Sequence, residues 1–319
     1  MQHLRTHLTP PDSQWSRHGT DFHARRWHAC RVRPAAGPAA SRKRPRVSDQ
    51  TTPGGSDPQQ EAQIRRIAAM LAEAKRVVVL TGAGVSAESK IPTFRDAMEG
   101  LWASFDPQSL ATPEGFAADP ETVTKWYDFR RMKCREAEPN PGHLALARIE
   151  RELESRSRDF ILLTQNVDGL HRRAGNRSVV ELHGSLEVWR CTETGEEFRD
   201  LPAPFDTYPP RTPRGTVLRP GVVWFGEMLP PEAIETAGER LDACDLFFAI
   251  GTSATVYPAA GFSDLARAAG ASTVEINPDA TPASGHVDES VRARAGAVLP
   301  QIVELAFGDG NASSRGGNG

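Results

Sequence analysis

Short, continuous apolar runs are the feature that most constrains the fold of this chain. They occupy residues 77–80, 160–163, 179–180, 246–250 and 273–276. Runs of this length are typical of strands that are covered on both faces of a parallel sheet. Amphipathic segments, expected to be helices, separate several of them over about 61–75, 121–136, 143–154, 232–242 and 258–269. Strands that alternate with such helices predict an α/β fold, a Rossmann-like doubly wound parallel sheet.

One stretch interrupts this alternation. Between Thr192 and Pro220 the chain is rich in proline, carries mixed charges and shows no sustained periodicity. We therefore predict a small, loop-rich lobe that is inserted into the sheet domain at about 187–220. The folded domain as a whole is expected at 59–310, and residues 311–319 are predicted to be a disordered tail.

The N-terminal leader, residues 1–58, differs in composition from the rest of the chain. Residues 1–50 hold ten Lys/Arg and three Asp, a net charge of +7, and the remaining residues carry −10. Because the leader has little apolar periodicity, we predict that it is disordered. A nucleic-acid-binding arm, a nuclear address and an organelle transit peptide are the functional alternatives to a solvated tail. The solvated tail is favoured, so nucleic acid is not an expected partner.

Composition also bears on where the protein works. The chain has no apolar run of about 18 residues, so no membrane span is expected. No apolar stretch follows the basic N-terminal residues, as a secretory signal requires. The cysteines Cys30, Cys134, Cys191 and Cys244 lie far apart in the sequence, which favours a reducing compartment over a disulfide framework. These features predict a cytoplasmic protein.

A glycine-rich turn follows the first predicted strand. Gly82-Ala83-Gly84-Val85-Ser86-Ala87 has the form G-x-G-x-x-A. Such a turn lets the backbone approach a pyrophosphate, and the N–H groups of the following helix then face the anion. The alternative is a purely structural turn. No strand that ends in an acidic residue follows about twenty positions later, and this disfavours an ordinary nicotinamide dehydrogenase.

At several separated places the sequence resembles the sirtuin family. Residues 82–96 (GAGVSAESKIPTFRD) are similar to its NAD-binding loop, and residues 164–168 (TQNVD) to its TQN[IV]D element. His183-Gly184 resembles the catalytic His-Gly, and residues 221–227 (GVVWFGE) resemble the segment that pairs with the substrate peptide. Residues 251–253 (GTS) and 275–277 (EIN) resemble the ribose- and adenine-side contacts. The resemblance covers about residues 61–308.

This resemblance implies a sirtuin-like catalytic domain that uses NAD as a cosubstrate. Gly82, Gln165, His183, Gly251 and Asn277 each follow a predicted strand, and the carboxyl ends of the strands are where an open α/β sheet binds ligands. The implied cofactor-binding residues are Gly82, Ala83, Gly84, Ser86, Ala87, Glu88, Thr93, Phe94, Arg95, Gln165, Asn166, Asp168, Gly251, Thr252, Ser253, Asn277 and Ala295.

The reaction of the family implies a role for each catalytic residue. The amide oxygen of an acyl-lysine attacks the nicotinamide ribose, nicotinamide leaves, and the acyl group ends on the ribose as O-acyl-ADP-ribose. His183 would be the base that deprotonates a ribose hydroxyl, since an imidazole titrates near working pH. Asn166 and Asp168 would orient ribose hydroxyls and a water.

Each of these residues also has a structural interpretation. His183 could be a core histidine bonded to a backbone carbonyl, and Asp168 could only cap the helix that begins at Leu170. Phe94 would shield the reactive ribose carbon or else pack in the core. Arg95 would face phosphate or be a surface charge.

Substrate contacts are implied on two segments. Tyr127 and Arg130 lie at i and i+3 of a helix that Asp119-Pro120 is expected to start, so they share one face. This Y-x-x-R pattern resembles the sirtuin subgroup that prefers succinyl- and malonyl-lysine, because a guanidinium and a phenol together bind a carboxylate. Contacts to the peptide, an acylated lysine segment of a protein, are expected from Val222, Val223, Trp224 and Phe225.

The sequence departs from the family at its zinc site. Cys191 stands where the first of two C-x-x-C pairs would begin, but Thr194 replaces its partner and no cysteine follows before Cys244. One thiolate cannot form a tetrahedral structural site. We therefore predict no bound zinc and a lobe that is held by packing and prolines. Whether Cys191 belongs to a residual metal site stays open.

The predicted function is an NAD-dependent protein-lysine deacylase with desuccinylase, demalonylase and deacetylase activity. Two other functions fit the same pocket. Protein mono-ADP-ribosyl transfer shares the step in which nicotinamide leaves, and a non-catalytic NAD-binding protein is compatible with the loss of the zinc ligands.

Overall fold

A six-stranded parallel sheet forms the centre of the molecule. The computed structural model describes residues 32–34, 58–91 and 110–308. The strand order is β11-β10-β8-β2-β3-β4, and each pair of neighbouring strands is parallel. The strands are β2 (Arg76–Thr81), β3 (Asp159–Thr164), β4 (Val179–Glu181), β8 (Leu246–Ile250), β10 (Ser272–Ile276) and β11 (Glu289–Val291). The predicted α/β fold is therefore confirmed.

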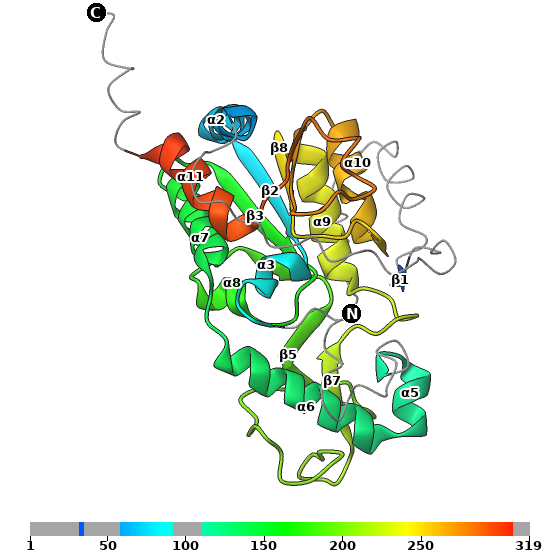
Figure 1. Cartoon of the computed structure of the whole chain (residues 1–319). Coiled ribbons are helices and arrows are strands. Elements are labelled where there is room, and N and C mark those ends of the chain that lie inside the picture. Colours follow the sequence, from blue (N-terminus) through cyan, green and yellow to red (C-terminus); the bar gives the residue numbers. More distant parts are fainter. Residues whose placement is uncertain (1–31, 35–57, 92–109, 309–319) are drawn as a thin grey trace, which may run out of the picture.

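Helices cover both faces of this sheet. In Figure 1, α2 (Pro58–Glu73), α7 (Pro141–Glu154) and α11 (Ala295–Phe307) lie on one side, and α9 (Pro231–Ala243) and α10 (Phe262–Ala268) on the other. Side chains alternate accordingly along β2: Val77 and Val79 join the first hydrophobic cluster, while Val78 and Leu80 join the second. Full burial of each such side chain stabilises the fold by about 1.5–3 kcal/mol.

Helix α11 was not predicted. Its buried residues Ala295, Val298, Leu299, Ile302, Val303 and Ala306 recur with helical spacing. The signal was therefore in the sequence, but Pro300 lies inside the helix and argues against a helix there. Apolar packing against α7 and α2 outweighs the one lost backbone hydrogen bond.

The small lobe is larger than the predicted insertion. Its antiparallel sheet, order β6-β5-β7, consists of β5 (Gly184–Cys191), β6 (Glu197–Phe198) and β7 (Leu218–Val222). Two helices from earlier in the chain, α5 (Pro113–Ala118) and α6 (Pro120–Glu136), complete it. Trp126 of α6 and Trp189 of β5 belong to one hydrophobic cluster. The lobe is thus built from two segments that are distant in sequence.

A buried ion pair links α6 to the proline-rich loop of this lobe. Asp128 and Arg131 side chains are fully buried, 2.6 Å apart. Arg131 also donates to Pro202 O at 2.5 Å, and Asp128 accepts from Phe205 N at 2.8 Å and from the Tyr208 hydroxyl at 2.5 Å. The Arg131 guanidinium lies 4.4 Å from the ring centroid of Phe205. This network fixes the 202–208 loop on α6.

Part of the leader departs from the expected disorder. Strand β1 (Arg33–Pro34) pairs antiparallel with β9 (Val256–Tyr257), and Val32 is buried. The rest of the leader and residues 309–319 lie outside the described residues.

Short elements complete the fold: α3 (Ala83–Ala87), α8 (Leu170–Arg173) and the 3-10 turn η2 (Ala259–Gly261).

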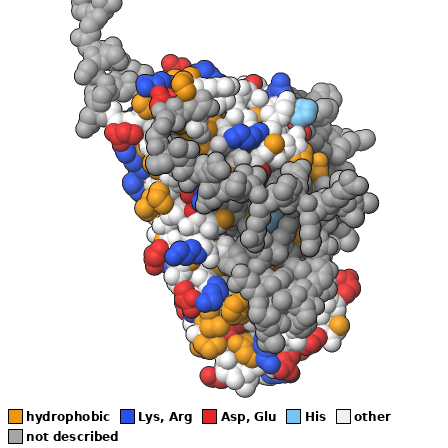
Figure 2. Space-filling model, in the orientation of Figure 1, with side chains coloured by type: hydrophobic (Ala, Val, Ile, Leu, Met, Phe, Trp, Pro, Cys, Tyr) orange, Lys and Arg blue, Asp and Glu red, His pale blue; other side chains and the backbone are white. Residues whose placement is uncertain are grey.

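The surface of the described part is mixed in charge. Figure 2 shows Lys and Arg side chains interspersed with Asp and Glu on the face that it presents. Ion pairs such as Arg135–Glu187 and Arg190–Glu197 account for part of this pattern. None of the helices that the structure describes is both long and apolar enough to cross a membrane.

We predict that Arg131→Met destabilises the protein by about 3–5 kcal/mol, because it leaves the Asp128 carboxylate buried without its cation. Urea unfolding followed by tryptophan fluorescence measures the change. Lys133→Met on the same helix is the control, since Lys133 forms an exposed pair with Glu136 and its loss costs at most about 1 kcal/mol. Equal stability of the two variants would contradict this account.

Candidate active site

The site lies at the boundary between β2 and β8, where the order in which the chain adds strands to the sheet reverses. From β2 the chain adds β3 and β4 on one side, and later β8, β10 and β11 on the other. The boundary between β2 and β8 is therefore the topological switch point of the sheet, where open α/β sheets bind ligands. Gly82 and Gly251 begin these two turns, and Gln165 and Asn277 follow the neighbouring strands.

The two turns are in direct backbone contact. Gly84 N donates to Gly251 O at 2.8 Å, and Gly82 N donates to Ile250 O at 3.1 Å. Gly251 has a φ of +59°, and a Cβ there would lie 2.4 Å from Val85 N. The glycines are thus required for close packing of one turn on the other. The N–H groups of Gly82 and Gly84 are bonded within the protein.

Other parts of this turn remain open to a ligand. Ala83, Gly84 and Ala87 are exposed, whereas Ser86 beneath them is buried. The turn therefore presents its backbone outward and anchors itself through a polar side chain on the inner side. Such a surface suits the flat, polar face of a dinucleotide.

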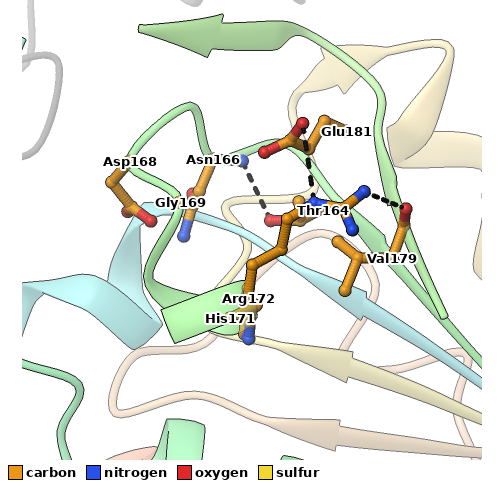
Figure 3. Close-up of a pocket in the computed structure, with 8 residues that line it drawn as sticks. All are labelled: Thr164, Asn166, Asp168, Gly169, His171, Arg172, Val179 and Glu181. Atoms are coloured by element: carbon orange, nitrogen blue, oxygen red, sulfur yellow. Dashed lines mark hydrogen bonds and ion pairs between the residues drawn. The ribbon is translucent and has the colours of Figure 1, made fainter. Parts of the chain in front are cut away.

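The inner side of the turn is held by a polar network. Asn166 Nδ2 donates to Gly82 O and to Ser86 Oγ, both at 3.0 Å, and Ser86 Oγ donates to Asp168 Oδ2 at 2.7 Å. Asp168 also accepts from Leu170 N, the first N–H of α8, at 2.9 Å while it binds Ser86, and Gly169 is the N-cap. Figure 3 shows Asn166 and Asp168 beside each other, apart from the Arg172–Glu181 pair in the same pocket.

Two histidines that the sequence analysis missed extend this network. Asn140 N donates to His143 Nδ1, so the His143 proton is on Nε2, 3.4 Å from Ser86 Oγ. His171 Nε2 lies 2.9 Å from Thr81 Oγ1. The ring centroids of His143 and His171 are 4.7 Å apart. Burial lowers the pKa of His143 to about 4 and that of His171 well below its usual value.

His183 is held as a neutral imidazole. It lies between β4 and β5, and its Nδ1 is 3.0 Å from Gln165 O. Because a carbonyl only accepts, Nδ1 carries the proton and Nε2 keeps its lone pair. Nε2 is buried and has no partner among the described residues. Burial lowers the pKa of His183 to about 4, although the bond to Gln165 opposes the shift. The bond to the Gln165 carbonyl is therefore confirmed, and it is compatible with the predicted catalytic role, which stays a prediction.

The residue after His183 must be glycine. Gly184 has a φ of +75°, and a Cβ there would lie 2.1 Å from Gly221 O on β7. On the same segment, Val223 N donates to His183 O at 2.9 Å. Residues 221–227, the segment predicted to pair with a substrate peptide, are therefore bonded directly to the His183 backbone. Val222 is buried opposite Gly184, and Phe225 N donates to Ala111 O at 2.9 Å.

Tyr127 and Arg130 lie together on α6, and Asp119 caps this helix as expected. Trp224 Nε1 donates to the Tyr127 hydroxyl at 3.0 Å. The Arg130 guanidinium lies 4.8 Å from the Trp126 ring centroid and 5.6 Å from that of Tyr127. Burial raises the pKa of Tyr127 to about 12, so its phenol stays protonated. Trp224 is buried, and its hydrogen bond holds the Tyr127 hydroxyl in position.

The remaining described residues among the implied cofactor contacts follow β8 and β10 or lie near the start of α11. Asn277 Nδ2 donates to Thr252 O at 2.6 Å, and Ser253 Oγ lies 2.7 Å from Thr255 Oγ1. Glu88 accepts from Gly296 N at 3.0 Å, so it fixes the start of α11 beside Ala295. Thr93, Phe94 and Arg95 lie outside the described residues.

Among the described residues, no second thiolate lies beside Cys191, where the family's zinc ligands would be. Hydrogen bonds from the side chain and backbone of Thr194 lower the pKa of Cys191. The other described cysteines, Cys134 and Cys244, are buried elsewhere, in α6 and after α9. In the part of the chain that the structure describes, no group of three or more His, Cys, Asp or Glu could hold a metal ion.

Comparison with known proteins agrees with this geometry. The Sir2 family matches residues 82–258. An NAD-dependent protein deacylase of Thermus thermophilus is 54% identical over 213 residues, 66% of this chain and 83% of the relative. NAD-dependent protein deacylase 1 of Pseudomonas aeruginosa is 46% identical over 252 residues, 76% of this chain and 99% of the relative.

Solved structures show the same likeness. A Sir2 homolog in complex with NAD superposes with a TM-score of 0.71 at 46% identity and covers 76% of this chain and 93% of its own. Sir2 bound to acetylated peptide gives a TM-score of 0.67 at 25% identity, with 77% and 99% covered.

We predict that stability falls as the pH falls from 7.5 to 5.5. His143, His171 and His183 have lowered pKa values in the folded state, so below about pH 6.5 the unfolded chain binds protons that the folded chain does not. Each contributes a slope of up to about 1.4 kcal/mol per pH unit. Urea unfolding at both pH values measures it. His171→Gln should lose about one third of the slope, and a pH-independent stability would refute the account.

Proposed function

Because this chain belongs to the Sir2 family, whose relatives above are NAD-dependent protein deacylases, we propose that it removes succinyl, malonyl and acetyl groups from lysine side chains of proteins. The observation that carries the proposal is the joint placement of a neutral His183 and the Asn166–Asp168 pair at adjoining strand ends. Tyr127 and Arg130 supply the argument for acidic acyl groups.

The state of His183 suits the deprotonation step. Its Nδ1–H bond to Gln165 O fixes the tautomer, and its free Nε2 is the atom that accepts a proton from a ribose hydroxyl. Burial keeps the imidazole neutral at physiological pH, so Nε2 is available as an acceptor, but a pKa of about 4 makes it a weaker base than the sequence analysis expects. Proton transfer of this kind contributes roughly 10²–10⁴-fold to a rate.

Asn166 and Asp168 suit the positioning of NAD. Both side chains are oriented by Ser86, which is itself part of the turn that faces the dinucleotide. The position of the ribose relative to His183 would thus be set by one connected network. This preorganisation lowers the entropic cost of bringing the ribose hydroxyl to the acyl carbon.

Tyr127 and Arg130 suit recognition of an acyl carboxylate. Since Tyr127 accepts from Trp224, its own O–H can donate to a carboxylate oxygen. Arg130 supplies a cation beside the same ring, at 5.6 Å from its centroid. A carboxylate bound by both groups gains charge-assisted hydrogen bonds that an acetyl group cannot form.

The small lobe would keep its shape without zinc. Cys191 faces Thr194 rather than a second thiolate, and the Asp128–Arg131 pair anchors the proline-rich loop. These contacts support the inference that no structural zinc is bound. Cys191 lies at the opposite end of β5 from His183, so the loss leaves the proposed catalytic groups in place.

We predict that Arg130→Met lowers kcat/KM for succinyl- and malonyl-lysine peptides by about 10- to 100-fold, and that for acetyl-lysine by less than about 3-fold. The loss corresponds to one charge-assisted hydrogen bond of about 1.5–3 kcal/mol. Mass spectrometry of the three peptides incubated with enzyme and NAD measures it. Lys133→Met, an exposed change on the same helix, is the matched control. An unchanged succinyl-to-acetyl ratio would contradict the acyl preference.

The same assay tests the reaction itself. Every deacylated peptide should be matched by one nicotinamide and one O-acyl-ADP-ribose. His183→Ala should abolish the deacylated peptide and O-acyl-ADP-ribose, because the histidine acts after nicotinamide has left. His286→Ala, at an exposed histidine, should leave them unchanged. Label from NAD on the acceptor protein, with no O-acyl-ADP-ribose, would identify an ADP-ribosyltransferase instead. Absence of turnover with bound NAD would identify a non-catalytic binding protein.

A further inference from the structure

Strand β1 of the leader lies between two backbone segments beside the site (Figure 1). On one side, Val32 N donates to Glu227 O at 3.0 Å, and Gly226 N donates to Val32 O at 3.1 Å. On the other side, Arg33 and Pro34 are paired antiparallel with Tyr257 and Val256. The leader therefore bridges residues 226–227 and β9 as a central extended strand.

The slot that β1 fills borders the catalytic residues. Its first wall continues the segment in which Val223 N bonds His183 O, and Glu227 Oε2 accepts from Trp224 N at 2.8 Å. Its second wall, β9, follows directly on the turn at Gly251. An extended peptide that pairs with both walls would run along the segment whose Val223 N bonds His183 O.

The side chain of Val32 is seated in this slot. It is 4% exposed and belongs to the hydrophobic cluster against which Val223, Phe225 and Val256 pack. Val223 and Phe225 are the residues whose contacts with a substrate peptide the sequence predicts. The leader thus uses both the backbone edges and the apolar lining that a substrate segment would need.

We propose that residues 32–34 act as an internal competitor that occupies the acyl-peptide slot and must leave before a substrate binds. This inference rests on the proposed deacylase function. A tether keeps the competitor at a high effective concentration, so it raises the apparent KM for peptide even when its own affinity is low. The net charge of +7 on residues 1–50, against −10 on the rest, favours the docked position.

The leader strand is suited to release. It is only two residues long, and Pro34 has no N–H with which to extend the pairing to β9. A substrate peptide can form a longer strand and insert an acylated lysine, so it can displace the leader. The slot would then favour peptides that pair with both walls over free acyl-lysine.

The test measures binding of a labelled acetyl-lysine peptide to the full chain by fluorescence anisotropy. Val32→Asp places a charge in an apolar position and should eject the leader, so the peptide should bind about tenfold more tightly. Val32→Pro removes the N–H that bonds Glu227 O and should act in the same direction. Val32→Ile keeps the bond and the apolar side chain, and should bind as the unaltered chain does.

The outcomes separate this inference from the proposed function. Tighter peptide binding in both disruptive variants supports the competitor, even if neither variant releases nicotinamide from NAD, a result that would end only the deacylase proposal. Equal or weaker peptide binding in Val32→Asp and Val32→Pro, in proteins that melt cooperatively, overturns the competitor and shows β1 to be a fixed wall of the site. Normal turnover in that case would leave the deacylase proposal standing.

Discussion

Close backbone packing between the turns after β2 and β8 is the constraint on which the site depends. Gly84 and Gly251 approach each other so closely that a Cβ on either would overlap the other's backbone. This contact fixes Ser86 on the inner side of its turn, and Ser86 in turn orients Asn166 and Asp168. The parallel sheet brings the strand ends to one edge, and the glycine contact sets their final positions.

The second constraint is the attachment of the small lobe to that edge. β5 begins directly after His183, and Val223 bonds the His183 carbonyl, so the segment proposed to pair with substrate is attached to the proposed catalytic histidine. Further out, the buried Asp128–Arg131 pair ties the proline-rich loop to α6, which also carries Tyr127 and Arg130. One helix therefore carries both the ion pair that stabilises the lobe and the two residues proposed to bind the acyl group.

Much of this architecture was readable from the sequence. The apolar runs predicted five of the six strands of the parallel sheet, because strands covered on both faces need continuous apolar residues. Asp119 was correctly expected to start α6, since Asp followed by Pro suits a helix N-terminus. The placement of Gly82, Gln165, His183, Gly251 and Asn277 at one edge follows from parallel topology alone.

What escaped prediction depends on contacts between distant residues. The pairing of α6 with β5, the bond between Thr81 and His171, and the seat of Val32 all join segments far apart in the chain. The periodicity of apolar residues within one segment carries no information about such long-range contacts. The glycines after β2 were assigned to ligand approach, but their packing against Gly251 appears only when both turns are in place.

The central claim is that His183 is held as a neutral base with its proton on Nδ1 and its Nε2 lone pair free. Nitrogen-15 NMR of the histidine side chains across pH 4–8, with His183→Gln to assign the signal, tests it most directly. The account predicts an Nδ1–H tautomer whose titration lies well below pH 6.5, because burial disfavours the imidazolium. An Nε2–H tautomer, or a pKa at or above about 6.5, would contradict it.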